Sequence, residues 1–279
     1  MGARVDLLMP VAGSHYDADA ADLAKPFGKA FAAAGMTLSP RPWDSGPGDG
    51  DATLALFAWG YHFDVARWEA LLAAWPADRP LFNPPALLTW NTRKTYLREL
   101  AAAGVPIVPS RFGHADDASV AAAFDAFGCD ELVVKPQVSA GSHQTVRLRR
   151  GEAVEPLGDA ILQPFLPAIV DEGELSLFAI GGRFNHAARK VATGGDFRIQ
   201  PQFGGRFTRY TPDAEALAVF DATLAALPQA PLYARIDLLR RADGQLALIE
   251  VEAIEPDLYV ELEPDVPARL AAALLDALR

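Results

Sequence analysis

The chain has one cysteine, few basic residues and no long apolar run. Because Cys129 is alone among 279 residues, the chain contains neither an internal disulfide nor a cysteine-rich metal site, which favours a reducing compartment. The net charge of -11 excludes the overall basic character of proteins that bind nucleic acids or anionic membranes. No run reaches the ~18 apolar residues of a membrane helix. Arg4 and Asp6 interrupt the N-terminal apolar run, unlike in a secretion signal. We therefore expect a cytoplasmic globular protein without a nucleic-acid or membrane partner.

The length and the apolar pattern predict the fold class. At roughly 150 residues per domain, 279 residues correspond to about two domains. Apolar runs at 5–9 and 53–58 flank a helical pattern at 19–34, which is typical of a parallel α/β domain. From residue 131 onward strands and turns dominate, with helices expected at 214–227 and from 268. We expect an α/β protein whose C-terminal part is α+β, with a boundary near the prolines at 80–85.

Charged residues flank a predicted hairpin near the C-terminal end. Asp243 and Gly244 separate two apolar runs and predict a two-residue turn. Counting outward from this turn pairs Asp237 with Glu250 and Arg235 with Glu252. Because side chains alternate along a strand, all four charged side chains share one face. The apolar residues between them are expected on the opposite, packed face: Ile236, Leu238, Ile249 and Val251.

Three carboxylates on one face of a hairpin repel one another unless a positive charge lies between them. Carboxylate oxygens are ligands that Mg²⁺ prefers in proteins. A solvated acidic face balanced by Arg235 alone is the alternative, and the hairpin by itself leaves both open.

The run Arg235-Ile236-Asp237 followed by Glu250-Val251-Glu252 resembles the metal-binding strands of the ATP-grasp superfamily of carboxylate–amine ligases, the glutathione synthetase and D-alanine:D-alanine ligase-like fold. The resemblance implies that Asp237, Glu250 and Glu252 hold Mg²⁺ on the phosphates of ATP, as two ions, with Mn²⁺ as a substitute. Glu252 departs from the usual Asn at this position. The resemblance also implies that Arg235 stabilises charge on the acyl phosphate and on the tetrahedral intermediate.

The same resemblance assigns upstream residues to the nucleotide. Local pattern predicts a helix that contains Lys94, is capped by Asn91 or Thr92 and ends at Gly104. The resemblance implies that Lys94 and Lys135 contact the phosphates. A loop of small residues follows Lys135, where backbone N–H groups can approach phosphate oxygens. The residues that complete the implied ATP site are the loop residues Ser139, Gly141 and Ser142, the adenine hinge Gln163, Phe165 and Leu166, and the ribose carboxylate Glu174, with Asp171 as the alternative to Glu174.

A glycine-rich basic segment lies between the hinge and the hairpin, at residues 188–206. Its glycines predict a mobile or tightly turned segment. It resembles the loop that reaches over the reacting carboxylate in similar ligases, which implies that Arg198 clamps the acyl phosphate and that Lys190, or Arg189, lies near the γ-phosphate. A basic surface loop is the alternative.

The order of these motifs implies three parts: a Rossmann-like pre-ATP-grasp domain at 1–88 and two ATP-grasp subdomains at 89–166 and 167–279. The implied reaction is ATP-dependent activation of a small amino-acid-like carboxylate as an acyl phosphate, followed by attack of an amine. Segments 58–62, 194–198 and 254–259 are similar to D-cycloserine-type cyclo-ligases, so intramolecular closure is one alternative. Tyr61 and His62 are then candidates for the acceptor pocket, but the sequence favours a lone exposed histidine at His62. A nucleotide-binding protein of this fold without turnover is another alternative, and similar ligases are often homodimers.

Overall fold

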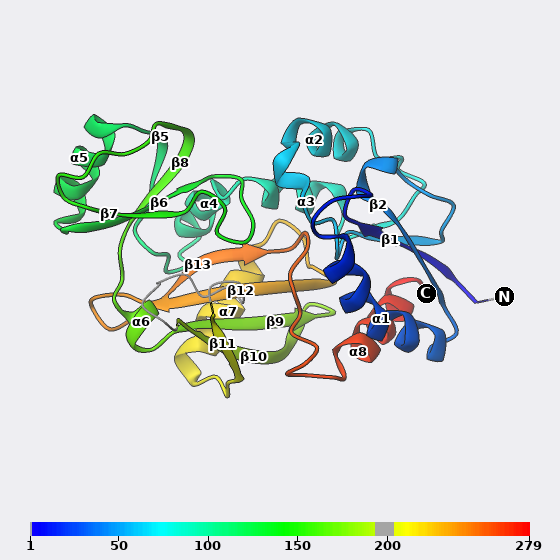
Figure 1. Ribbon diagram of the computed structural model, residues 1–279. Coiled ribbons are helices and arrows are strands. Elements are labelled where there is room, and N and C mark those ends of the chain that lie inside the picture. Colours follow the sequence, from blue (N-terminus) through cyan, green and yellow to red (C-terminus); the bar gives the residue numbers. More distant parts are fainter. Residues whose placement is uncertain (1, 193–203) are drawn as a thin grey trace.

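The described residues fold around three β-sheets, which follow one another along the sequence. The computed structural model describes residues 2–192 and 204–279. Figure 1 shows the first and second sheets at opposite ends of the molecule, with the third sheet between them. Within the described residues, no helix has the length and apolar content that a bilayer crossing requires.

The N-terminal sheet is parallel, as the sequence predicts. Its order is β2-β1-β3-β4. Its apolar strands pack against α1, whose buried face carries Ala20, Ala24, Phe27 and Phe31. The predicted strand at 53–58 ends at Leu54, and the chain then turns toward the sheet edge. The elements are β1 (Arg4–Met9), α1 (Asp17–Ala33), β2 (Thr37–Pro42), η1 (Trp43–Ser45), β3 (Ala52–Leu54), η2 (Tyr61–Phe63), α2 (Val65–Ala73) and β4 (Leu81–Phe82).

The middle sheet is antiparallel, in the order β5-β8-β6-β7, and α5 covers one face. Asp116 begins α5 because its carboxylate accepts a hydrogen bond from the Ser119 N–H while the Ser119 hydroxyl accepts one from the Asp116 N–H. The elements are β5 (Arg111–Ala115), α5 (Asp117–Phe127), β6 (Glu131–Pro136), β7 (Val146–Arg149) and β8 (Leu157–Pro164).

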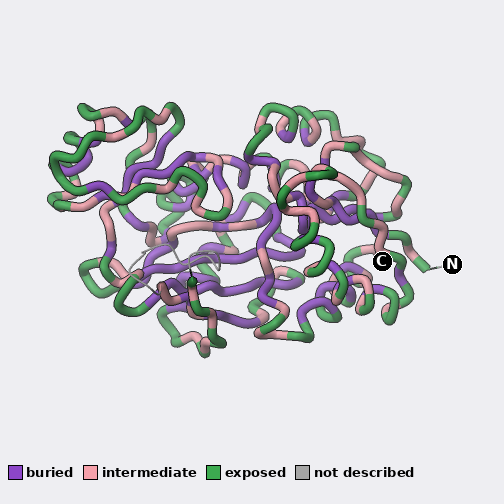
Figure 2. The backbone as a smooth tube through the Cα atoms, viewed as in Figure 1, coloured by how far each residue is buried: buried purple, intermediate pink, exposed green. Residues whose placement is uncertain are grey.

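The third sheet is antiparallel, in the order β11-β10-β9-β12-β13. Its central strand β9 is buried along its whole length (Figure 2). Helices α4 and α7 pack on one face, against Leu177, Ile236 and Leu248. The elements are α3 (Pro85–Thr92), α4 (Tyr96–Ala102), α6 (Ala168–Asp171), β9 (Glu174–Ile180), β10 (Arg183–Val191), β11 (Arg206–Arg209), α7 (Ala214–Ala226), β12 (Tyr233–Arg240), β13 (Leu246–Glu252) and α8 (Val266–Ala277).

The prediction that Asn91 or Thr92 caps the helix of Lys94 is wrong. Both residues end α3, and Lys94 lies in the break before α4. The Asn91 amide instead donates to the Val251 carbonyl at 2.8 Å and accepts from the Ala253 N–H at 2.7 Å. Tertiary hydrogen bonds to β13 therefore outcompete the local capping pattern. They also fix the position of Lys94 beside β13.

One asparagine joins the N-terminal domain to the third sheet. The Asn83 side chain donates to the carbonyls of Tyr233 and Ala253, at 2.8 and 2.7 Å, and accepts from the Leu232 N–H at 2.6 Å. It is completely buried, so all three hydrogen bonds are shielded from water. The edge of the first sheet is thereby held against the start of β12 and the end of β13.

His186 on β10 is expected to make stability depend on pH. Its Nε2 lies 3.2 Å from the Leu258 carbonyl oxygen, and its ring stacks on Phe178. Burial lowers the pKa of His186 to about 4, because the hydrogen bond to Leu258 only partly opposes it. The unfolded chain, with a His pKa near 6.5, binds more protons between pH 6.5 and 4, so stability falls as the pH falls through this window.

The free energy of unfolding should fall between pH 7 and pH 5 in the wild-type protein. We expect this fall to be about 2 kcal/mol smaller in His186→Gln. Urea unfolding at the two pH values measures this loss. His15→Gln is the matched control because His15 is exposed. An unchanged pH dependence in His186→Gln would contradict the assignment.

Candidate functional site

The predicted hairpin register is confirmed at the charged pairs, although its turn differs. Arg235 pairs with Glu252 and Asp237 with Glu250. The turn has three residues rather than two, because the Arg241 N–H donates to the Gln245 carbonyl and Gly244 adopts the left-handed conformation at φ +84°. A bulge between Asp237 and Leu238 then restores the predicted pairing.

The bulge corrects one prediction. Ile236, Leu238 and Val251 pack on the covered face as expected, whereas Ile249 lines the cavity on the other face. Ile249 is the extra residue of β13, since Leu248 pairs with Leu238 and Glu250 with Asp237. The bulge therefore places an apolar side chain and Glu250 side by side on the same face.

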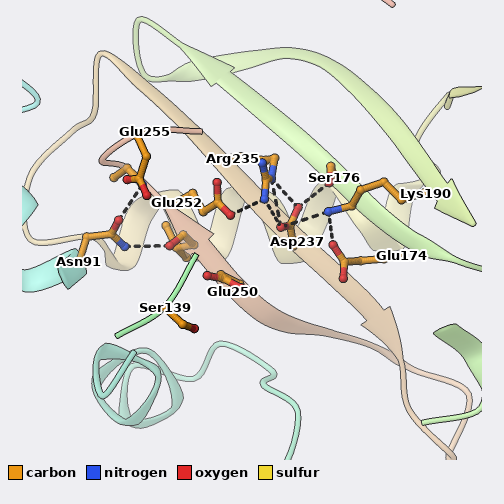
Figure 3. A network of polar contacts seen from close by, with 12 residues as sticks. Asn91, Ser139, Glu174, Ser176, Lys190, Arg235, Asp237, Glu250, Glu252 and Glu255 are labelled. Atoms are coloured by element: carbon orange, nitrogen blue, oxygen red, sulfur yellow. Dashed lines mark hydrogen bonds and ion pairs between the residues drawn. The ribbon is translucent and has the colours of Figure 1, made fainter. Parts of the chain in front are cut away.

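Arg235 and Asp237 form the centre of a buried ionic network (Figure 3). The Arg235 guanidinium donates to the Asp237 carboxylate at 3.0–3.1 Å and to Glu252. Ser176, the β9 residue paired with Asp237, donates its hydroxyl to the same carboxylate. Asp237 is only 2% exposed. Burial raises its pKa, but Arg235 and Lys190 outweigh burial and lower it to about 2, so the carboxylate stays ionised.

Lys190 lies in strand β10, so the prediction that its segment is a turned loop is wrong at this residue. Its ammonium contacts Glu174 on β9 and lies 3.4 Å from Asp237. Arg189 is the next residue along the strand, and its guanidinium stacks over the Tyr210 ring, 4.9 Å away. Adjacent strand residues point to opposite faces. Of the two basic residues considered, Lys190 alone lines the cavity.

The other two cavity lysines differ in their partners. The Lys94 ammonium donates to the Ser139 carbonyl at 2.7 Å and lies 3.1 Å from the Glu250 carboxylate. Lys135, at the end of β6, is 7% exposed, and its side-chain ammonium has no hydrogen bond or ion pair to any residue in the described parts of the chain. Burial lowers the pKa of Lys135, although Glu250 opposes this shift.

The loop after Lys135 passes over the cavity. Ser139, Gly141 and Ser142 all line it. Gly141 and Ser142 adopt the left-handed conformation, at φ +59° and +60°. This conformation is unfavourable for serine, and such strain concentrates at ligand-binding sites.

The far end of the cavity is apolar. The predicted hinge residues Gln163, Phe165 and Leu166 lie there, at the end of β8 and just beyond it. The Arg147 guanidinium stacks 3.5 Å from the Phe165 ring centroid. Sequence reasoning did not identify the other apolar walls, which are Val108, Ile169, Leu239 and Ile249. It also missed Ser176, although a lone serine in an apolar strand was a signal.

One cavity brings these residues together. Lys94, Lys135, Ser139, Gly141, Ser142, Gln163, Phe165, Leu166, Glu174, Lys190, Arg235, Asp237, Glu250 and Glu252 line it. Arg198 lies outside the described residues. Asp171, the alternative to Glu174, is exposed at the end of α6 and is not a lining residue.

The charged lining residues are four basic and four acidic: Lys94, Lys135, Lys190 and Arg235 against Glu174, Asp237, Glu250 and Glu252. The cavity therefore carries no net formal charge. Burial and the neighbouring carboxylates raise the pKa of Glu252 to about 7, although Arg235 opposes this shift. An additional cation would stabilise the ionised carboxylates on this side of the cavity.

The hairpin carboxylates fit a magnesium site by their chemistry. Asp237, Glu250 and Glu252 are hard oxygen donors on one face, and all three border the same cavity. In the residues that the structure describes, no three His, Cys, Asp or Glu side chains form a preassembled metal cluster. Basic side chains balance the three carboxylates instead. This donor set suits an ion that arrives with further ligands of its own, such as phosphate oxygens and water.

Comparisons with known proteins place these features in context. No family model matches the chain. The chain is 29% identical over 272 residues to the cycloserine biosynthesis protein DcsG of Streptomyces lavendulae, covering 88% of this chain and 90% of that protein. The crystal structure of the D-cycloserine synthetase DcsG matches with a TM-score of 0.83 and 26% identity, over 99% of this chain and 100% of that one.

Two more distant structures share the fold. The ATP-grasp ligase PsnB, in a complex that contains Mg and ADP, matches at a TM-score of 0.70 and 15% identity, over 100% of this chain and 99% of that one. The D-alanine–D-alanine ligase of Bacillus anthracis matches at 0.68 and 12% identity, over 100% and 97%. At these identities the similarity concerns the fold alone.

Proposed function

We propose that this chain, which is an ATP-grasp ligase related to D-cycloserine synthetase, binds ATP and Mg²⁺ in the cavity between its second and third sheets and activates a small amino-acid-like carboxylate. The γ-phosphoryl group moves from ATP to the carboxylate oxygen, which gives an acyl phosphate and ADP. An amine then attacks the acyl carbon, phosphate leaves, and an amide bond forms.

The single observation that carries the phosphate assignment is Lys135. The residue is 7% exposed and lines the cavity, and its ammonium lacks a partner in the described residues. An unpaired buried charge is costly, so such a site attracts an anion. The neighbouring backbone at Gly141 and Ser142 offers N–H groups that suit phosphate oxygens. We therefore place the phosphates between Lys135 and this loop.

The opposite end of the cavity suits a purine base. Leu239, Ile249 and Val108 supply apolar walls, and Phe165 follows the strand β8 that borders them. Backbone groups of Gln163 and Leu166 are available there for the polar edge of adenine. We assign Glu174 to the ribose hydroxyls, since a carboxylate accepts two hydrogen bonds from a diol. Lys190, its present partner, is then near the phosphates.

We assign Asp237, Glu250 and Glu252 to Mg²⁺, as two ions, with Mn²⁺ as a substitute. ATP adds about four negative charges to a cavity whose own formal charge is zero, so divalent cations are required for balance. When bound, Mg²⁺ neutralises phosphate charge and orients the phosphate oxygens.

Arg235 is the residue that we assign to the developing charge. Its guanidinium is held by Asp237 and Glu252, so its position is fixed before the substrate arrives. A preorganised cation in a water-poor site stabilises charge that develops on the acyl phosphate and on the tetrahedral intermediate. We also propose, from the sequence alone, that Arg198 acts as a second clamp on the acyl phosphate.

A specific observation favours a second version of this reaction. The relative at 29% identity over 272 residues has cycloserine biosynthesis in its name. We therefore propose intramolecular closure, in which the amine and the carboxylate belong to one substrate molecule, as the alternative to joining two molecules. We propose a cytoplasmic location for either version of the reaction. Either version is also compatible with a homodimer.

The test is ADP release from ATP and Mg²⁺ in the presence of single small amino acids and their aminooxy analogues. We expect release that requires the acceptor and that disappears with EDTA. Mass spectrometry separates the two versions, because closure removes one water from one substrate molecule, whereas ligation joins two. Absence of ADP release with every acceptor would contradict the ligase assignment.

A further inference from the structure

A second group of polar side chains gathers beside the nucleotide cavity, where the first sheet faces the segment after β13. Tyr16 follows β1, and Trp59 and His62 follow β3, so all three lie at the carboxyl edge of the parallel sheet. Such edges are the usual ligand-binding side of open α/β sheets. The Trp59 indole N–H donates to the Glu255 carbonyl at 3.1 Å, which holds the facing segment against this edge.

Glu255 is a buried residue whose carboxyl group has no partner among the described residues. It is 9% exposed, and its carboxylate makes no hydrogen bond or ion pair with residues 2–192 or 204–279. Burial and the nearby Glu252 and Glu250 raise the pKa of Glu255 well above its usual range. Figure 3 shows Glu255 at the end of the row of charged side chains, next to Glu252. The surroundings of this carboxyl therefore favour a cation.

The basic side chains that interact with Glu255 through space are already engaged. Lys94 lies 3.1 Å from Glu250, and Arg235 contacts Asp237 and Glu252. Neither forms an ion pair with Glu255 among the contacts that the described chain makes. Within the described residues, neither of these cations is therefore available to Glu255, and a cationic ligand would supply the charge that it lacks.

The expectation of an exposed histidine is wrong at His62, which is buried at the same edge and whose ring has no hydrogen-bond partner among the described residues. It is 9% exposed, and neither ring nitrogen has a hydrogen-bond partner in the described structure. Burial lowers the pKa of His62 to about 4, with smaller effects from His143, Lys94 and His15. Its imidazole is therefore neutral near pH 7. The Tyr16 ring lies 6.4 Å from that of His62, and the charge of Glu255 influences the Tyr16 phenol, so Tyr16 links the two groups.

We propose that Glu255 binds the ammonium group of the small amino-acid-like substrate, with the His62 imidazole as a second polar contact. This inference rests on the proposed function, because it places the substrate beside Glu252 and Lys94 at the phosphate end of the cavity. A primary ammonium supplies the positive charge that Glu255 lacks and can donate up to three hydrogen bonds. Glu255 thus determines specificity for amino acids over other carboxylic acids.

The test compares amino acids with hydroxy acids that differ only at this group. The probes are both enantiomers of alanine and serine against both enantiomers of lactate and glycerate, titrated into the full-length protein saturated with Mg²⁺ and ADP. We expect the wild-type protein to bind one amino acid at least about tenfold more tightly than its hydroxy analogue. The hydroxy analogue lacks the charged ammonium group that donates hydrogen bonds to Glu255. We expect Glu255→Gln to reduce this preference to about twofold or less.

Two further variants make the result specific. Glu261→Gln removes an exposed carboxylate from the same segment and should leave the preference unchanged. Glu255→Asp keeps the charge on a shorter side chain and should retain a preference for the amino acid. ADP binding to each variant, measured in parallel, shows that the nucleotide cavity is intact.

Three outcomes would overturn the inference: no amino acid binds to the wild-type protein, Glu255→Gln keeps the full preference, or Glu255→Gln changes only the Mg²⁺ dependence of ADP binding. The proposed function fails separately. Amino-acid binding that depends on Glu255 without any ADP release would contradict the ligase reaction and support the subsite. ADP release by a Glu255→Gln protein whose preference for the amino acid is unchanged would support the ligase reaction and contradict the subsite.

Discussion

Replacing Asp237 with Asn is expected to reduce acceptor-dependent ADP release by roughly a thousandfold or more. The substitution keeps the shape of the side chain but removes the charge that is assigned to Mg²⁺. It also removes the carboxylate that receives hydrogen bonds from Arg235 and Ser176. Both the cation site and the position of the Arg235 guanidinium are therefore lost. Initial rates at saturating ATP and Mg²⁺ measure the effect.

Stability must be measured together with the rate. Removing one member of a buried ionic network costs about 3 kcal/mol, so urea unfolding has to show that Asp237→Asn is folded under assay conditions. Glu250→Gln separates the two effects. Its carboxylate is partly exposed, and among the described residues it forms an ion pair with Lys94 alone. We therefore expect a comparable loss of activity with less loss of stability.

The matched control for both variants is Asp243→Asn. Asp243 lies in the exposed turn of the same hairpin and should have wild-type activity. Wild-type ADP release by either Asp237→Asn or Glu250→Gln would show that the metal assignment is wrong. A loss of activity in Asp243→Asn as well would indicate that the hairpin, rather than its carboxylates, is responsible.

Replacing Lys135 with Met is expected to weaken ATP binding by about a hundredfold, because a charge-assisted contact to phosphate is lost in a water-poor site. The same change should stabilise the ligand-free protein by about 1 kcal/mol, since it removes a buried charge that has no partner in the described residues. These two effects have opposite signs. A purely structural lysine would lose stability on substitution and leave ATP affinity unchanged.

Titration with an ATP analogue and urea unfolding of the ligand-free protein measure the two effects. Lys29→Met is the control, because Lys29 is exposed on α1, far in sequence from the cavity residues. Unchanged affinity in Lys135→Met would place the phosphates elsewhere. Reduced affinity in Lys29→Met would indicate an effect of net charge rather than of position.

In the hairpin, the predicted charged pairs are correct because two departures from the predicted backbone cancel each other. The two-residue turn predicted from Asp243 and Gly244 is a three-residue turn, which shifts the pairing by one residue. The bulge at Ile249 shifts the pairing back. The charged pairs therefore match the prediction although the backbone between them does not. A turn is set by local conformational preferences, whereas a bulge depends on what the strand packs against.

The helix near Lys94 shows the limit of local pattern. Asn91 has the chemistry of a helix cap, and that preference is real in an isolated helix. In the folded chain its amide bonds to the backbone of β13, 160 residues away. The glycine-rich segment is a similar case at Lys190, because pairing with β9 extends a strand into a stretch that its composition assigns to a loop. Partners distant in sequence decide both positions.

The roles of individual cavity residues and the bounds of the three predicted domains stay predictions. What the sequence by itself determined is the set of chemical groups and their order: lysines, small-residue loop, hinge, acid, and paired carboxylates. Periodicity and residue type are local properties, so they can be read without the fold. Tertiary structure alone decided that fourteen of the predicted side chains line one cavity, and that most of its cations are already paired. It also revealed that the charged groups of Lys135 and Glu255 have no partner among the described residues. Pairing and burial depend on contacts between distant segments, which no local pattern encodes.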